Sequence, residues 1–150
     1  MLKDKLQEEL KQSMLAKNEL RTSVIRLLLS AITYHEIQKG GAGYKASDED
    51  VIEVVGREIK KRRESIEMYE SAARTELADK EKKELEILQT FLPEQMNEEE
   101  VRQLVKQAIK DTNAKTPQEM GKVMGALMPK VKGKADGTMV SNLVREELSA

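Results

Sequence analysis

The apolar residues of this chain recur every three or four positions almost from end to end. That spacing is typical of α-helices, because residues three and four apart lie on one face of a helix. No segment shows the alternation of apolar and polar residues, bounded by turn signals, that indicates a β-strand. The sequence therefore predicts an all-α fold in which each helix buries one apolar stripe.

Four helices are expected in the first part of the chain: over about 3–17, from beyond Asn18 to near Lys39, over about 48–73 and over about 75–91. Their buried stripes should include Met14, Leu27 and Leu77. Ser47, followed three residues later by Asp50, indicates the capped start of the third helix. Whether the third and fourth helices are separate stays open, since no Gly or Pro lies between them.

Pro93 marks a boundary, because proline disfavours helix at the residue before it and lacks a backbone N–H. We expect an N-terminal helical domain of long helices over 1–92 and a small C-terminal three-helix domain over 93–150. Capping residues and prolines give the limits of the short helices, with starts at Asn97, Thr116 and Asp136 and a stop at Pro129.

Composition excludes several classes of site. The chain has no Cys and one His, His35, which rules out disulfides, Cys-based metal sites and multi-His metal centres. We predict no metal and no cofactor. No apolar run approaches the roughly 20 residues of a membrane span, so no membrane partner is expected. The charged N-terminus resembles neither a signal peptide nor an Arg-rich transit peptide, which predicts a cytoplasmic protein.

Three features could be interpreted as functional sites, but a structural interpretation is simpler for each. The sequence places no catalytic or ligating partner near His35, so a partly buried packing role is favoured. The segment Gly40–Lys45 lacks the P-loop motif and a preceding strand, and is interpreted as a loop with a helix cap. The basic run within Arg57–Glu64 could contact phosphates, but a solvated helix face balanced by neighbouring acids is favoured.

Two features of the C-terminal part are more suggestive. Gly121 and Gly125 lie four apart on an expected helix, where each costs about 1 kcal/mol relative to Ala. Either the close approach of a partner or tight packing inside the small domain would explain them. The second feature is a loop with three alternating lysines and a glycine, namely Lys130, Lys132, Gly133 and Lys134. It ends at a helix start, so it could hold backbone phosphates, or it could be a soluble turn.

Three consecutive segments resemble signatures of the YqeY-like (GatB/YqeY) family: Phe91–Met96, Met120–Gly125 and Val131–Gly137. The first half is similar to the same family through Leu20–Ala31, Lys61–Ser65 and Arg74–Ala78. The resemblance thus covers essentially the whole chain. One departure is Ala73, where Gly is expected in this family.

The resemblance implies an all-α protein whose C-terminal domain is similar to the tail of the B subunit of glutamyl/aspartyl-tRNA amidotransferase, which helps to hold the tRNA. Similar modules are appended to a glutaminyl-tRNA synthetase. Family members often carry the label of carbon–nitrogen ligases with glutamine as amido-N-donor. Nothing in this chain resembles the amidase subunit or the ATP-dependent core of the B subunit, so no catalytic residue is expected.

We therefore expect a tRNA-binding accessory module. Three tyrosines and one phenylalanine are too few for a base-stacking platform, so binding should use phosphates and shape, with salt-dependent affinity. The expected RNA contacts are Lys122, Lys130, Lys132, Lys134, Gly121, Gly125 and Gly133. Two alternatives stay open: a protein–protein adaptor for an aminoacyl-tRNA synthetase or amidotransferase, and a free-standing carbon–nitrogen ligase. The oligomeric state also stays open.

Overall fold

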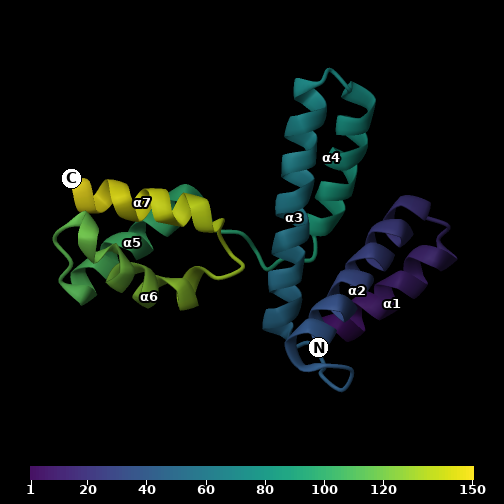
Figure 1. Cartoon of the computed structure of the whole chain (residues 1–150), viewed down its shortest axis with the longest axis horizontal. Helices are drawn as coiled ribbons and strands as arrows, with labels where there is room; N and C mark the ends of the chain where they lie inside the picture. Colours follow the sequence, from purple (N-terminus) through teal and green to yellow (C-terminus); the bar gives the residue numbers. More distant parts are fainter. The chain divides into compact units, whose positions relative to one another are not determined.

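The computed structural model describes residues 1–150 as helices joined by short loops (Figure 1). It contains seven α-helices, one short 3-10 helix and no strand, which confirms the all-α fold. The chain divides into two compact units, Met1–Leu92 and Pro93–Ala150, called unit 1 and unit 2 below. No helix combines the length and the apolar composition that crossing a bilayer requires.

Unit 1 is built from two antiparallel helix pairs (Figure 1). The first pair is α1 (Leu2–Leu15) with α2 (Glu19–Gly40), and the second is α3 (Asp48–Ser71) with α4 (Thr75–Gln89). Because α2 also packs on α3 and α4, the two pairs share one core. Its buried members are Leu6, Val24, Leu28, Ile32, Ala46, Val51, Val54, Val55, Ile59 and Leu88.

The structure shows that the third and fourth expected helices, α3 and α4, are separate and are joined by a turn. Ala73 has a left-handed conformation, with φ 56. Its N–H donates to the carbonyl of Glu70 over 3.1 Å, and the N–H of Arg74 donates to that of Tyr69 over 2.8 Å. This pair of bonds is the Schellman motif, which ends a helix. The helices are therefore separate although neither Gly nor Pro lies between them, and Lys17, also with φ 56, ends α1 in the same way.

Three residues predicted to be buried are exposed instead. Met14 is 50% exposed, Leu27 53% and Leu77 42%. Met14 and Leu77 lie next to interhelix turns, where a helix has little besides its hairpin partner to pack on. Leu27 lies on a face of α2 that no other helix covers. The spacing of apolar residues identifies the helix correctly. Which part of its surface is buried depends on where the neighbouring helices pack.

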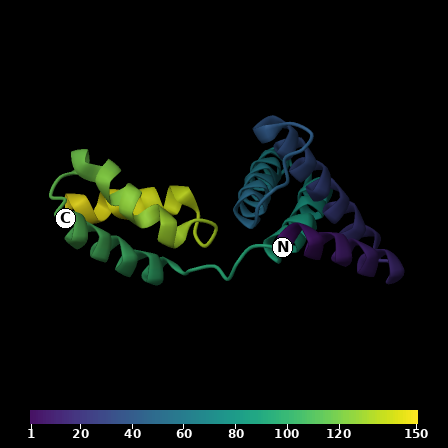
Figure 2. The ribbon, with the colours of Figure 1, turned by 90° about the horizontal axis from the view of Figure 1, so that it is seen from below.

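Unit 2 contains α5 (Glu98–Thr112), the 3-10 helix η1 (Pro117–Glu119), α6 (Met120–Val131) and α7 (Gly137–Ser149). Its three α-helices pack on one another (Figure 2). They form a second core that shares no residue with the core of unit 1. The buried members are Val101, Val105, Ala108, Ala114, Val123, Leu127, Val131, Val140, Leu143, Val144 and Leu148.

The start signals of unit 2 are confirmed, and the stop signal is wrong. Asn97 caps α5, Asp136 caps α7, and Thr116 caps the 3-10 helix η1, which leads directly into α6 at Met120. By contrast, α6 continues through Pro129 to Val131. A proline inside a helix loses one hydrogen bond and crowds the carbonyl four residues earlier. Here the loss is confined to the last turn, and Lys132 N–H still donates to the Met128 carbonyl over 2.9 Å.

Candidate functional site

One strip on the outer side of α6 carries little side-chain bulk, and the exposed residues Lys122, Ala126 and Lys130 flank it. Val123 and Leu127, both 0% exposed, define the buried side. Gly121, Gly125 and Pro129 follow one another at intervals of four residues, so they share a face of the helix. A Cβ added to either glycine would meet no atom within 4 Å. Tight packing inside unit 2 therefore does not explain these glycines, and α6 presents bare backbone to solvent.

The lysines predicted to bind RNA are exposed and form no ion pair. Every ion pair of unit 2 is made by Arg102, with Glu98, Glu146 and Glu147. This leaves the four lysine charges without a bridging carboxylate; they are Lys122, Lys130, Lys132 and Lys134. Lys122 lies on α6 between the two glycines, so the structure brings a cation and bare backbone together on one helix.

The lysine loop is shorter than the sequence predicts. Lys130 lies in the last turn of α6, and Lys132 ends the helix with φ −57 and ψ 123. Of the predicted RNA contacts, only Gly133 and Lys134 lie in the irregular stretch beyond the end of the helix. Gly133 has φ 76, a conformation that glycine adopts far more readily than other residues. This glycine is therefore needed for the turn itself.

The loop is tied to the segment that precedes α5. The Gln95 side-chain amide donates to the carbonyl of Gly133, and the N–H of Met96 donates to the carbonyl of Lys134, each over 2.8 Å. At the other end, the Asp136 carboxylate accepts from the N–H of Thr138 over 3.1 Å. The start of α7 thus already has an acceptor, so anion binding here would depend on the lysine side chains.

A second polar cluster, missed by the sequence analysis, lies in unit 1 around Asp50. This residue is 2% exposed. Its carboxylate accepts hydrogen bonds from Lys39 Nζ over 2.6 Å, Tyr44 OH over 2.6 Å and the Ser47 N–H over 3.0 Å. Lys39, followed by Tyr44, holds the pKa of Asp50 far below its usual range. In return Asp50 raises the pKa of Lys39 to about 12.

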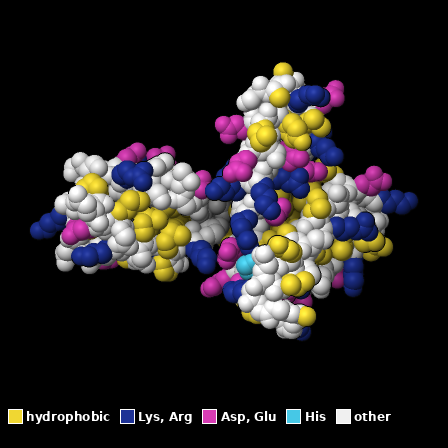
Figure 3. Space-filling model, in the orientation of Figure 1, with side chains coloured by type: hydrophobic (Ala, Val, Ile, Leu, Met, Phe, Trp, Pro, Cys, Tyr) yellow, Lys and Arg dark blue, Asp and Glu magenta, His cyan; other side chains and the backbone are white.

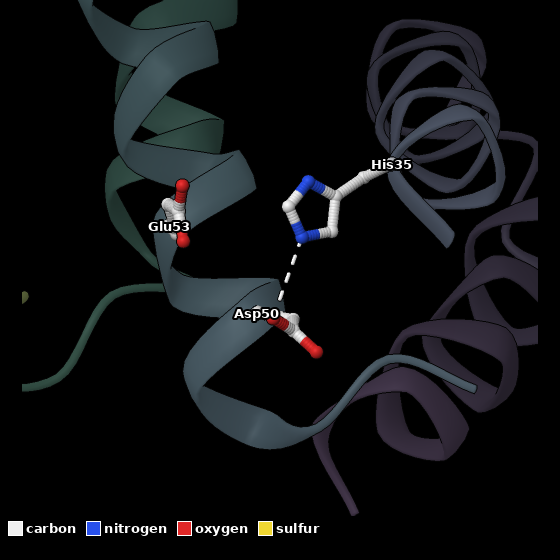
Figure 4. A group of neighbouring side chains, drawn as sticks. All are labelled: His35, Asp50 and Glu53. Atoms are coloured by element: carbon white, nitrogen blue, oxygen red, sulfur yellow. Dashed lines mark hydrogen bonds and ion pairs between the residues drawn. The ribbon is translucent and has the colours of Figure 1, made fainter. Parts of the chain in front are cut away.

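His35 joins this cluster from α2 and points toward Asp50 and Glu53 of α3 (Figure 4). Its Nε2 lies 3.3 Å from Asp50 Oδ1, and its Nδ1 lies 2.7 Å from Arg57 Nη2. A guanidinium can only donate, so Nδ1 accepts and Nε2–H donates. The side chain is 13% exposed, which agrees with a partly buried role. Figure 3 shows it as the single cyan group among acidic and basic side chains.

The cluster also contains the one trio that could be compared with a metal site. Ligand atoms of His35, Asp50 and Glu53 lie within 4.8 Å of one another. However, Asp50 is already saturated by donors, and an entering cation would meet the charges of Lys39 and Arg57. We therefore interpret the cluster as a structural joint that ties α2, the loop after it and α3 together.

The basic run of α3 is only partly a solvated face. Arg62 forms ion pairs with Glu81 over 2.9 Å and with Glu84, both on α4. Lys61 pairs with Glu58 within α3, as a balanced helix face predicts. Within this run Arg62 therefore joins α3 to α4, and Arg57 contacts His35 of α2.

Comparison with known proteins gives a family match over nearly the full length. A family model described as "Yqey-like protein" matches residues 3–148. A protein of Pyrenophora tritici-repentis named "Altered inheritance of mitochondria protein 41, mitochondrial" is 30% identical over 151 residues, covering 97% of this chain and 80% of that protein. A Kluyveromyces lactis protein of the same name is 35% identical over 133 residues, with coverages of 83% and 70%.

Other relatives match over a shorter stretch. A Vanderwaltozyma polyspora protein, again with that name, is 37% identical over 87 residues, covering 58% of this chain and 46% of that protein. The match thus spans about half of this relative. The names describe these fungal proteins as mitochondrial, and the cytoplasmic location expected for this chain stays a prediction.

Proposed function

Since this chain belongs to the Yqey-like protein family, we propose that it is a tRNA-binding accessory module related to tRNA-dependent amidotransferases. Unit 2 contacts the tRNA backbone, and the chain itself carries out no chemistry. The observation that carries this proposal is the outer face of α6, where exposed glycines stand beside a lysine without an ion-pair partner.

The exposed helix backbone and the lysines without ion-pair partners would each contribute to binding a phosphate backbone in a different way. Lysines are flexible point charges that release counterions when they neutralise phosphates, which gives affinity without reading bases. A helix face without side chains lets a sugar–phosphate strand approach closely. Alanine at position 121 or 125 would favour the helix more than glycine does, so the presence of Gly121 and Gly125 on an open surface supports a ligand that needs the space.

The aromatic residues support recognition of shape over bases. All four precede Pro93: Tyr34, Tyr44, Tyr69 and Phe91. Unit 2 therefore has no aromatic ring on which an unpaired base could stack, and such stacking is the usual way in which proteins hold single-stranded RNA. The expected ligand is a folded RNA whose backbone, and not its base sequence, is contacted.

The test is tRNA binding at several salt concentrations by filter binding. Lys130→Ala, Lys132→Ala and Lys134→Ala should each weaken binding to different tRNAs about equally, and each should lower the salt slope by about 1 or somewhat less. The matched control is Lys5→Ala, an exposed lysine of α1 in unit 1 that forms no ion pair. It should leave both quantities unchanged.

The triple lysine variant decides the outcome. If it stays folded by circular dichroism and binds tRNA as tightly as the parent chain, the lysines have no role in RNA binding and the proposal is wrong. Capture of a synthetase or amidotransferase by that same variant would then support the adaptor function.

A further inference from the structure

α2 has an uncovered seam on its solvent side. Residues spaced alternately four and three apart share one narrow face of a helix and form the contact seam of coiled coils. Five exposed residues of α2 have this spacing: Ser23, Leu27, Ser30, Tyr34 and Ile37. The three large ones are 53%, 64% and 56% exposed in chain order. None of the five carries a charge.

This seam is unusual for its surroundings. Charged residues make up 35% of the chain, yet no Asp or Glu lies between Glu19 and Glu36. The opposite side of α2 is apolar and faces the core of unit 1. Apolar residues that lie together on an exposed surface commonly mark an interaction site, so Leu27, Tyr34 and Ile37 make a second element expected on the exposed seam.

We propose that the occupant is a second copy of this chain, whose α2 packs antiparallel on this one about a two-fold axis at Ser30. In that register the seam is complementary to itself, because small residues face large ones. Ser23 faces Ile37 of the second copy, Leu27 faces Tyr34, and Ser30 faces itself. Such isologous pairing is the common geometry of homodimers.

A surface hollow at one end of the seam fits this register. The hollow has a volume of about 670 Å³ and is lined by Met14, Lys17, Glu19, Thr22, Ser23, Arg26 and Leu27. Antiparallel pairing places Ile37 of the second copy over Ser23, at this hollow. The side chain of Ile37 of one copy would thus enter this hollow of the other beside Met14 and Leu27, with the charged residues of the lining around it, and the same contact recurs at the opposite end.

Charge distinguishes the antiparallel from the parallel arrangement. The only charged side chain beside the middle of the seam is Arg26, which contacts the sulfur of Met14 at 3.8 Å and forms no ion pair. In a parallel pair the two copies of Arg26 would lie level and repel. In the antiparallel pair they are about 12 Å apart along the axis, beyond the screening length of about 8 Å at physiological salt.

Disulfide trapping tests the register directly, because the chain has no native cysteine. Helices packed about 8–10 Å apart bring facing Cα atoms to about 4–5 Å, within reach of a disulfide. Ser30→Cys should therefore cross-link efficiently under mild oxidation. Ser23→Cys should not, since the two copies of residue 23 would lie about 21 Å apart. Ser71→Cys, an exposed serine at the end of α3, measures random collisions.

A second pair of variants links the cross-link to the seam. Leu27→Glu in the Ser30→Cys background should reduce cross-linking to the level of Ser71→Cys. Leu77→Glu, which changes an exposed leucine of α4, should leave it unchanged. Sedimentation of the parent chain over a concentration series should show a reversible dimer. Equal cross-linking at residues 23 and 30, or a monomer with no cross-linking above the collision level, overturns the proposal.

Discussion

Arg57 of α3 donates a hydrogen bond to Nδ1 of His35 of α2 over 2.7 Å. This contact fixes the tautomer of the imidazole, so that its other nitrogen donates to Asp50. A row of three side chains thereby joins the consecutive helices α2 and α3. The row ends on a carboxylate that Lys39 also binds, which makes Asp50 the group on which the joint depends.

Asp50 should give unit 1 a specific sensitivity to acid. Its pKa is lowered in the folded chain, so its stabilisation is complete above the unfolded pKa of about 3.9 and is lost as the pH falls below that value. Asp50→Asn should destabilise unit 1 at pH 7 by about 1–3 kcal/mol, and its stability should fall less steeply between pH 5 and 2. Urea unfolding followed by tyrosine fluorescence measures both.

The control for this prediction is Asp79→Asn, because Asp79 is exposed on α4 and accepts no hydrogen bond from a side chain. It should leave the pH dependence unchanged. Parallel stability curves for the parent chain and Asp50→Asn below pH 5 would show that the joint contributes nothing to acid unfolding.

The turn between α3 and α4 predicts an unusual response to glycine. Ala73 has φ 56, whereas its neighbour Ala72 has φ −90. A left-handed conformation costs a residue with a Cβ about 1–2 kcal/mol relative to glycine. Both Ala→Gly changes loosen the unfolded chain equally, so Ala73→Gly should be more stable than Ala72→Gly by about that amount. Thermal unfolding compares them, and equal melting temperatures would contradict the assignment.

The outer face of α6 predicts a conflict between stability and binding. Gly125→Ala should stabilise unit 2 by about 1 kcal/mol, since the added Cβ meets nothing within 4 Å. If RNA lies on that face, the same change should weaken tRNA binding. Gly56→Ala is the matched control, because Gly56 is a helical glycine of α3 with equally open surroundings. Identical binding by both variants would separate α6 from the RNA.

The two separate cores predict independent unfolding. Leu143 is 3% exposed in the core of unit 2, and Leu143→Ala should cost about 2–5 kcal/mol. Every aromatic residue lies in unit 1, so tyrosine fluorescence reports unit 1 alone while far-ultraviolet circular dichroism reports both. The substitution should therefore lower part of the dichroism transition and leave the fluorescence transition in place. A joint shift of both signals would mean that the chain unfolds as one.

Local signals predicted most of the helices, because helix period and capping act over a few residues. Ser47 with Asp50 and Asn97 with Glu100 both form the expected capping boxes. The turn at Ala73 could not be predicted in the same way. The left-handed residue of a Schellman motif is usually glycine, and here it is alanine.

The polar joint of unit 1 could not be predicted, because its partners meet only through the tertiary fold. The same holds for a second buried acid of α2, Glu36, which is 6% exposed and accepts from Lys3 Nζ over 2.7 Å, 33 residues away in the chain. One signal was present: Glu36 lies four residues after Ile32, on the buried stripe of α2. An acid on an apolar stripe indicates a buried pair but does not identify the partner. The glycines of α6 are a similar case. Their four-residue spacing is equally compatible with a helix face packed against a neighbour and with one exposed to solvent.

The sharp division between the two cores has a consequence for synthesis on the ribosome. Phe91 and Leu92 are the last residues packed on the first core, and Met96 already packs on the second. Unit 1 can therefore complete its core while the following residues are still in the exit tunnel. Unit 2 must wait for Leu148. A chain that stalls within unit 2 would thus carry a finished first unit and expose the apolar faces of an unfinished second one to chaperones and proteases.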